Sequence, residues 1–179
     1  MPKAEIAEIK LKGLSQERRD ALKKRMNGIG AAAGIQFKHG GMIGRSRDGH
    51  RLVHVAASRT AEGEEEGGEV VDALVEGIMR AFHEKERDVA DRDVLREIAA
   101  AAGMKSEDID EAFASEEVGK IVDAQAEKYR ALIDGAGVPT YYINGQRVDG
   151  SQDPGDWYEL FVKIKEGEDV PVQQGTACS

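Results

Sequence analysis

The chain has 179 residues, of which 33% are charged, and a net charge of -9 at pH 7. This excess of acidic over basic residues excludes a protein that holds nucleic acid through a basic face. The hydrophobic fraction of 40% is sufficient for one folded domain and argues against global disorder. No apolar run approaches the roughly 18 residues of a membrane helix, and the N-terminus lacks the apolar region of a signal peptide. The sequence therefore predicts a cytoplasmic protein without a membrane partner, and its single cysteine, Cys178, rules out an internal disulfide.

Most of the chain up to residue 134 has the periodicity of amphipathic helices. Residues 1–14 are expected to lead into these helices, and residues 35–37 to form a short extended segment. Residues 61–69 are acidic and rich in glycine, which predicts a solvated link. The expected helices with both ends defined cover 15–33, 69–84, 91–103 and 115–133. Two further helices are expected, one that begins near 46 or 47 and a short one that begins at 106. Their expected N-caps are Ser15, Asp91, Ser106 and Ser115.

Residues 138–149 carry the clearest signal of a β-hairpin. Val138-Pro139 precedes the aromatic and β-branched run from Thr140 to Ile143, and proline belongs at the first residue of a strand because it lacks a backbone donor. Asn144-Gly145 suits a two-residue turn in which both positions need positive φ. We therefore expect residues 146–149 to form the return strand.

A last helix is expected after the hairpin. Asp153-Pro154 combines a capping residue with proline at the first helical position. The apolar face of this helix comprises Trp157, Leu160, Phe161 and Ile164. A lone two-stranded hairpin is marginal in water, so the hairpin must pack on helices or be completed by further strands.

Four stretches resemble, in their order and spacing, the DsbA-like thioredoxin proteins of the FrnE type, which are close to 2-hydroxychromene-2-carboxylate isomerases and kappa-class glutathione transferases. The first stretch ends in His50-Arg51-Leu52, and the third contains Val138-Pro139 and Asn144-Gly145. The resemblance spans about residues 15–165, and the four stretches are 41–52, 71–95, 137–145 and 150–161.

The resemblance implies an α/β, thioredoxin-like fold with a large helical insertion. We expect one domain at 1–165, in which 15–134 are the insertion and 135–165 are the C-terminal thioredoxin half, followed by a flexible tail at 166–179. Family members begin with a strand, a Cys-x-x-Cys helix and a second strand, which this sequence lacks. The expected molecule is therefore a truncated form, dominated by helices and ending in a hairpin.

The resemblance implies a thiol–disulfide oxidoreductase homologue, but this chemistry needs an activated thiolate and a second thiol. With Cys178 alone, in the expected tail, the chain is expected to be redox-inactive. Val138 and Pro139 are the candidate substrate-binding residues, because the family's cis-proline loop leaves its backbone free to pair with a peptide or with glutathione. The alternative is a proline that only begins a strand.

His50 is the candidate catalytic residue, as a general acid or base near neutral pH, although a surface histidine is the commoner case. Arg47 and Arg51 are candidates for binding an anion such as glutathione; the alternative is a solvated face. His50 and His54 lie four residues apart but no third ligand completes a metal site, so we expect no metal and no cofactor other than glutathione.

Two alternatives to the oxidoreductase homologue remain open. One is a non-catalytic binding protein that self-associates through the open edge of the strand at 140–143. The other is a cysteine-independent isomerase or glutathione-binding enzyme that uses His50 and the backbone of Val138 and Pro139. The expected partners are a peptide or small thiol substrate, or a second copy of the chain.

Overall fold

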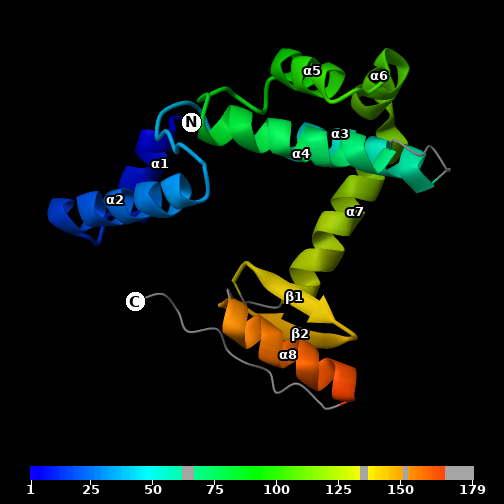
Figure 1. Ribbon diagram of the computed structural model, residues 1–179. Coiled ribbons are helices and arrows are strands. Elements are labelled where there is room, and N and C mark those ends of the chain that lie inside the picture. Colours follow the sequence, from blue (N-terminus) through cyan, green and yellow to red (C-terminus); the bar gives the residue numbers. More distant parts are fainter. Residues whose placement is uncertain (62–66, 134–136, 151–152, 168–179) are drawn as a thin grey trace. The chain divides into compact units, whose positions relative to one another are not determined.

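The computed structural model describes residues 1–61, 67–133, 137–150 and 153–167, and these contain eight helices and one two-stranded sheet (Figure 1). They divide into two compact units, Met1–Ala124 and Gln125–Ser179, which we call the helical unit and the hairpin unit. The elements, in chain order, are α1 (Lys3–Lys10), α2 (Gln16–Ala32), α3 (Arg47–Ala61), α4 (Gly67–His83), α5 (Arg92–Ala101), α6 (Ser106–Ala114), α7 (Glu116–Ile133), β1 (Thr140–Ile143), β2 (Gln146–Asp149) and α8 (Pro154–Glu166).

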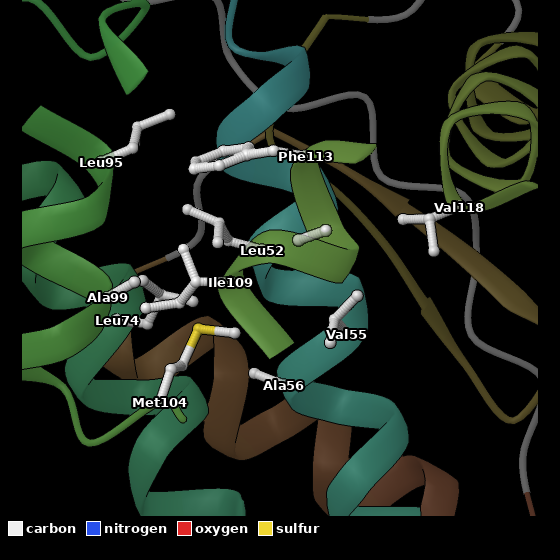
Figure 2. Close-up of a cluster of buried hydrophobic side chains, with 11 residues drawn as sticks. Leu52, Val55, Ala56, Leu74, Leu95, Ala99, Met104, Ile109, Phe113 and Val118 are labelled. Atoms are coloured by element: carbon white, nitrogen blue, oxygen red, sulfur yellow. The ribbon is translucent and has the colours of Figure 1, made fainter. Parts of the chain in front are cut away.

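The core of the helical unit lies between α3, α4, α5 and α6. Leu52, Leu74 and Leu95 are each 0% exposed and come from three different helices. Figure 2 shows the side chains of this cluster converging between the helices. The close approach of α4 to α5 depends on Gly77, since a Cβ there would lie 2.7 Å from Cγ2 of Ile98. The apolar residues that recur with helical periodicity in α3 and α4 thus form part of the packed core.

The expected N-caps are confirmed at three of the helices in this unit. The side chains of Ser15, Asp91 and Ser115 accept hydrogen bonds from the backbone N–H groups of Arg18, Asp93 and Val118, at 3.4, 2.8 and 3.2 Å. The fourth prediction was wrong, because α6 begins at Ser106 itself and Lys105 occupies the cap position without a side-chain hydrogen bond.

Residues 1–44 differ from the expectation near their start. The segment at 1–14 contains a helix, α1. Residues 35–37 belong to no helix or strand. Lys3 joins α1 to the end of α4, because its ammonium donates to the carbonyl of Phe82 and lies 3.6 Å from the centre of the Phe82 ring. A groove of about 780 Å³ lies along α1 and α2.

The hairpin unit matches the sequence prediction at both strands. Residues 140–143 pair antiparallel with 146–149, and the turn residues Asn144 and Gly145 have φ of 49° and 79°, as a two-residue type I′ turn requires. Asp153 caps α8 by accepting from the backbone N–H of Gly155 at 2.8 Å. Helix α8 packs on the hairpin through a small cluster, in which Val148 is 2% and Leu160 7% exposed.

Candidate functional site

The loop that enters β1 is anchored on both sides of Pro139. The Val138-Pro139 peptide bond is cis. The carbonyl of Pro139 accepts from the backbone N–H of Gly150 at 2.8 Å, and the hydroxyl of Thr140 donates to the carbonyl of Gly137 at 2.8 Å. Val138 itself is 82% exposed, and no hydrogen bond joins its backbone to any of the described residues. The loop thus presents a free peptide group at the start of a strand.

The free edge of β1 continues this exposed backbone. The hydrogen bond from the N–H of Gly150 to the carbonyl of Pro139, together with the turn that joins Ile143 to Gln146, shows which opposite residues of the hairpin exchange hydrogen bonds. Since antiparallel partners alternate between bonded and non-bonded pairs, the N–H and C=O groups of Thr140 and Tyr142 point away from β2. None of the described strands pairs with this row of donors and acceptors.

One face of the hairpin holds the last turn of α7. The hydroxyl of Tyr142 donates to the carbonyl of Leu132 at 2.7 Å, and a guanidinium nitrogen of Arg147 donates to the carbonyl of Ile133 at 2.9 Å. These carbonyls belong to the helix end and have no partner within the helix. Arg147 is itself oriented by Asp149, at 2.7 Å. The division between the two units therefore falls inside α7, whose last turn belongs to the hairpin.

The opposite face of the hairpin, where α8 packs, is open along β1. The residues that line this hollow, which we call the aromatic hollow, are Tyr141, Ile143, Pro154, Trp157, Tyr158 and Phe161. Its volume is about 790 Å³. The ring of Tyr141 meets Trp157 edge-on at 4.9 Å, and Trp157 stacks on Phe161 at 5.7 Å. Phe161 and Tyr158 remain 54% and 72% exposed.

The sequence analysis did not identify this hollow. Five of the nine aromatic residues in the chain lie between positions 141 and 161, and this concentration is the signal that could have revealed it. Trp157 and Phe161 were expected only as part of the apolar face of the last helix.

Arg47 lies at the start of α3 and pairs with α7. Its guanidinium donates two hydrogen bonds of 2.7 Å to the carboxylate of Asp123, which raises the pKa of Arg47 and lowers that of Asp123. Helix α7 carries Gly119 at the contact, where a Cβ would lie 2.6 Å from a guanidinium nitrogen of Arg47. The side chain that was a candidate for anion binding therefore already has a carboxylate partner.

Arg51 is buried, with 5% of its surface exposed. It donates to the carbonyl of Ser115 at 2.5 Å and lies 3.4 Å from Asp48, while its Nε has no partner among the described residues. Burial alone would raise the pKa of Asp48, but the hydrogen bond and charge of Arg92, with a contribution from Arg51, lower it overall. Arg51 thus joins the start of α3 to the junction of α6 and α7.

His50 lies in the first turn of α3 and is exposed. Its side chain has no hydrogen-bonding partner among the described residues, and His54 is half-buried one turn further along. Within the same described ranges, no group of three or more histidine, cysteine or acidic residues could hold a metal ion. His50 belongs to the helical unit and Val138 to the hairpin unit, and Cys178 lies outside the described residues.

No helix in the described parts of the chain combines the length and the apolar character needed to cross a membrane. Comparison with known proteins identifies a family. The model of the DSBA-like thioredoxin domain matches residues 1–159, while no curated protein matches the chain. Among solved structures, the chain is similar to a "probable DsbA oxidoreductase" from Streptomyces coelicolor. The TM-score is 0.68 and the sequence identity 26%, and the match covers 100% of this chain and 74% of the other.

Proposed function

Since the chain belongs to the DSBA-like thioredoxin domain family and has its helix-dominated, DsbA-like fold, we propose that it is an FrnE-type homologue of the DsbA oxidoreductases. In this proposal the chain binds an extended polypeptide beside Val138 but carries out no dithiol exchange by itself. We also propose that residues 1–165 form one domain that works in the cytoplasm, where a chain with one cysteine needs no oxidising compartment.

The observation that carries the peptide-binding role is the unpaired backbone that runs from Val138 into β1. An extended peptide can add to such an edge as a further strand, with main-chain hydrogen bonds that supply affinity and side-chain contacts that supply selectivity. The neighbouring aromatic hollow offers apolar contact to the same peptide.

The absence of dithiol chemistry rests on the cysteine count. A thiolate that attacks a disulfide forms a mixed disulfide, which a second thiol must resolve. The sequence contains only Cys178, so we expect no catalysed reduction of insulin by dithiothreitol in the presence of this chain. Clear turnover above the uncatalysed rate would contradict this part of the proposal.

Peptide binding can be tested with alkylated insulin B chain, which is extended and cannot form disulfides. Fluorescence anisotropy of the labelled peptide gives the affinity for the wild type and for two variants. Val138→Pro removes the backbone N–H at this position, and we expect affinity to fall about fivefold, as for the loss of one hydrogen bond.

The matched control for this test is Val138→Ala, which keeps the N–H and removes only the side chain. We expect it to change the affinity less than about twofold. Equal binding of wild type and Val138→Pro would overturn the proposed site, and near-ultraviolet circular dichroism verifies that both variants are folded.

We propose a second candidate function because the imidazole of His50 is exposed and lacks a side-chain partner among the described residues. In this alternative the chain is a cysteine-independent isomerase or glutathione-binding protein that uses His50 for proton transfer. Calorimetric titration with glutathione tests it. Binding that is lost in His50→Ala supports this alternative, and an absence of heat with the wild type would dismiss it.

A further inference from the structure

We infer that the contact of α1 and residues 37–41 with the end of α4 is a pH-sensitive junction, which opens when the imidazole of His83 takes up a proton. The junction comprises Lys3, residues 37–41 and residues 82–86, and we call this set the histidine junction. All of its residues belong to the helical unit. It joins the segment that carries α1 and α2 to the last turn of α4.

Backbone hydrogen bonds and a close approach hold the histidine junction together. The backbone N–H of Lys38 donates to the carbonyl of His83 at 2.8 Å, and that of Lys3 donates to the carbonyl of Gly41 at 3.0 Å. Gly41 has a φ of 85°, and a Cβ there would lie 2.6 Å from the carbonyl oxygen of Glu86. Because the two segments are in such close contact, a displacement of His83 also displaces residues 37–41.

The imidazole of His83 lies in surroundings that suit its neutral form. Its side chain is half-buried, and its ring meets those of Phe37 and Phe82 edge-on, with centroid distances of 5.3 and 4.9 Å. Neither ring nitrogen forms a hydrogen bond with a residue that the structure describes. A protonated imidazole has two N–H donors, and burying such donors without acceptors costs free energy.

The charge that acts on His83 is positive. The ammonium of Lys3 lies 3.6 Å from the centre of the Phe82 ring and donates to the carbonyl of Phe82. Burial and then the charge of Lys3 lower the pKa of His83 below its ordinary value. A proton on His83 therefore places a second cation in the junction, close to an ammonium group.

The other charged groups around the histidine junction act on His39. Burial, followed by the positive charges of Lys23 on α2 and of Lys3, lowers the pKa of His39. The charge of Glu86 acts in the opposite direction and is outweighed. Its carboxylate accepts from the backbone N–H of Gly40 at 2.7 Å, so it already has a partner within the junction. Both histidines thus resist protonation in the closed junction.

The direction of the pH dependence follows from these lowered pKa values. The closed junction binds fewer protons than the open one, in which the imidazoles are solvated and have their ordinary pKa of about 6.5. The closed form therefore has its full stability above that pH, and it loses stability as the pH falls through the lowered pKa of His83. We expect the junction to be closed at neutral pH and to open progressively in mild acid.

Opening of the histidine junction would alter the groove along α1 and α2. Four of the residues that line one end of this groove belong to the junction, and they are Lys38, His39, Gly40 and Glu86. The core between α3 and α6 should not respond in the same way, because its cluster of buried residues contains no titratable side chain. Acid should therefore change the groove while the core stays intact.

Amide hydrogen exchange of the full chain, followed by NMR at about pH 7.5 and about pH 5, tests the inference. The rates are corrected for the intrinsic pH dependence of exchange, and the amide of Lys38 reports on opening because it donates to the carbonyl of His83. We expect its opening equilibrium to increase at least about threefold in acid, with the amides of α3, α5 and α6 unchanged. An unchanged Lys38 amide, or an equal increase throughout the helical unit, would overturn the inference.

Two matched variants identify the histidine that is responsible. His83→Gln keeps a polar side chain that does not titrate in this range, and we expect it to abolish most of the acid response of Lys38. His54→Gln makes the same change at a half-buried histidine of α3 outside the junction, and it should respond to acid like the wild type. A full acid response in His83→Gln would contradict the role of His83.

The titration of the wild-type imidazoles tests the inference even if His83→Gln fails to fold. We expect the NMR signals of the His83 ring to titrate with a midpoint below about 6.5, and Lys3→Met, which removes the ammonium but keeps an apolar chain, to raise that midpoint. A wild-type midpoint at or above the ordinary value, or one that Lys3→Met leaves unchanged, would overturn the inference.

Discussion

The helical unit and the hairpin unit bury their apolar side chains to different extents. In the helical unit, a cluster of eleven buried residues from α3 to α7 and the loop between α5 and α6 includes Leu52, Leu74 and Leu95, each with no exposed surface. In the hairpin unit, the buried cluster comprises only Val148 and Leu160, while Tyr158 and Phe161 of the same helix are more than half exposed.

The difference shows that the two units contribute in different ways. The helical unit has a core that can stabilise itself, because its helices cover one another. The hairpin unit is thinner, and several of its described aromatic side chains remain exposed beside its small cluster. The candidate binding groups, which are Val138 and the outward backbone of β1, belong to this thinner unit.

The largest expected effect comes from shortening a side chain of the large core. Leu74→Ala leaves a cavity among side chains that are held on all sides, so we expect it to lower the free energy of unfolding by about 3 kcal/mol. Urea unfolding followed by far-ultraviolet circular dichroism measures this change. A loss below about 1 kcal/mol would mean that the helical core is loosely packed.

A smaller effect is expected from the equivalent change in the hairpin unit. Leu160→Ala removes one of two buried side chains, and the thin layer can relax around the gap, so we expect a loss of about 2 kcal/mol. Hydrogen exchange should show faster exchange in β1, β2 and α8, with α3 to α6 unchanged. Equal acceleration in both units would contradict their separate roles.

A third prediction concerns pH and the junction of α3 with α5. The lowered pKa of Asp48 means that this carboxylate stabilises the fold above its ordinary pKa, and that the stabilisation is lost as the pH falls through the lowered value. Asp48→Asn should therefore cost on the order of 1 kcal/mol at pH 7. The difference from the wild type should shrink as the pH falls through the lowered pKa of Asp48, as measured by urea unfolding at a series of acidic pH values. A difference that does not change with pH would show that the charge of Asp48 is not its cause.

The smallest effect is expected where the hairpin holds the end of α7. Tyr142→Phe removes the hydroxyl that donates to the carbonyl of Leu132. Because this bond is exposed, we expect a loss of about 0.5 kcal/mol and faster amide exchange limited to the last turn of α7. Acceleration throughout the helical unit would mean that this bond stabilises more than the helix end.

Features set by neighbouring residues were predictable from the sequence. The cap at Asp91, the Asn144-Gly145 turn and the start of α8 at Pro154 all depend on one or a few adjacent positions. The family resemblance then supplied the DsbA-like fold, which the comparison confirms. The cap of α6 was misplaced by one residue because Ser106 has the side chain of a typical N-cap, whereas the helix begins at Ser106 itself and its cap position is held by Lys105 without a side-chain bond.

Contacts between distant segments were not predictable. Arg51 was a candidate for binding an anion, with a solvated face as the alternative, but its partner is the carbonyl of Ser115, 64 positions away. No local pattern indicates such a bond. Helix α1 was missed because Ile6 and Ile9 give it only a weak apolar stripe. The aromatic hollow depends on how α8 lies on β1, which the periodicity of α8 alone does not determine.

The central claim is that the exposed edge of β1 binds an extended polypeptide, and amide hydrogen exchange tests it most directly. The measurement compares the chain with and without alkylated insulin B chain, at one fixed protein concentration. We predict that the amides of Thr140 and Tyr142, which exchange rapidly in the free chain, become protected when the peptide is added, while α3 to α6 are unchanged. Protection confined to the helical unit, or none at β1 under saturating peptide, would contradict the claim.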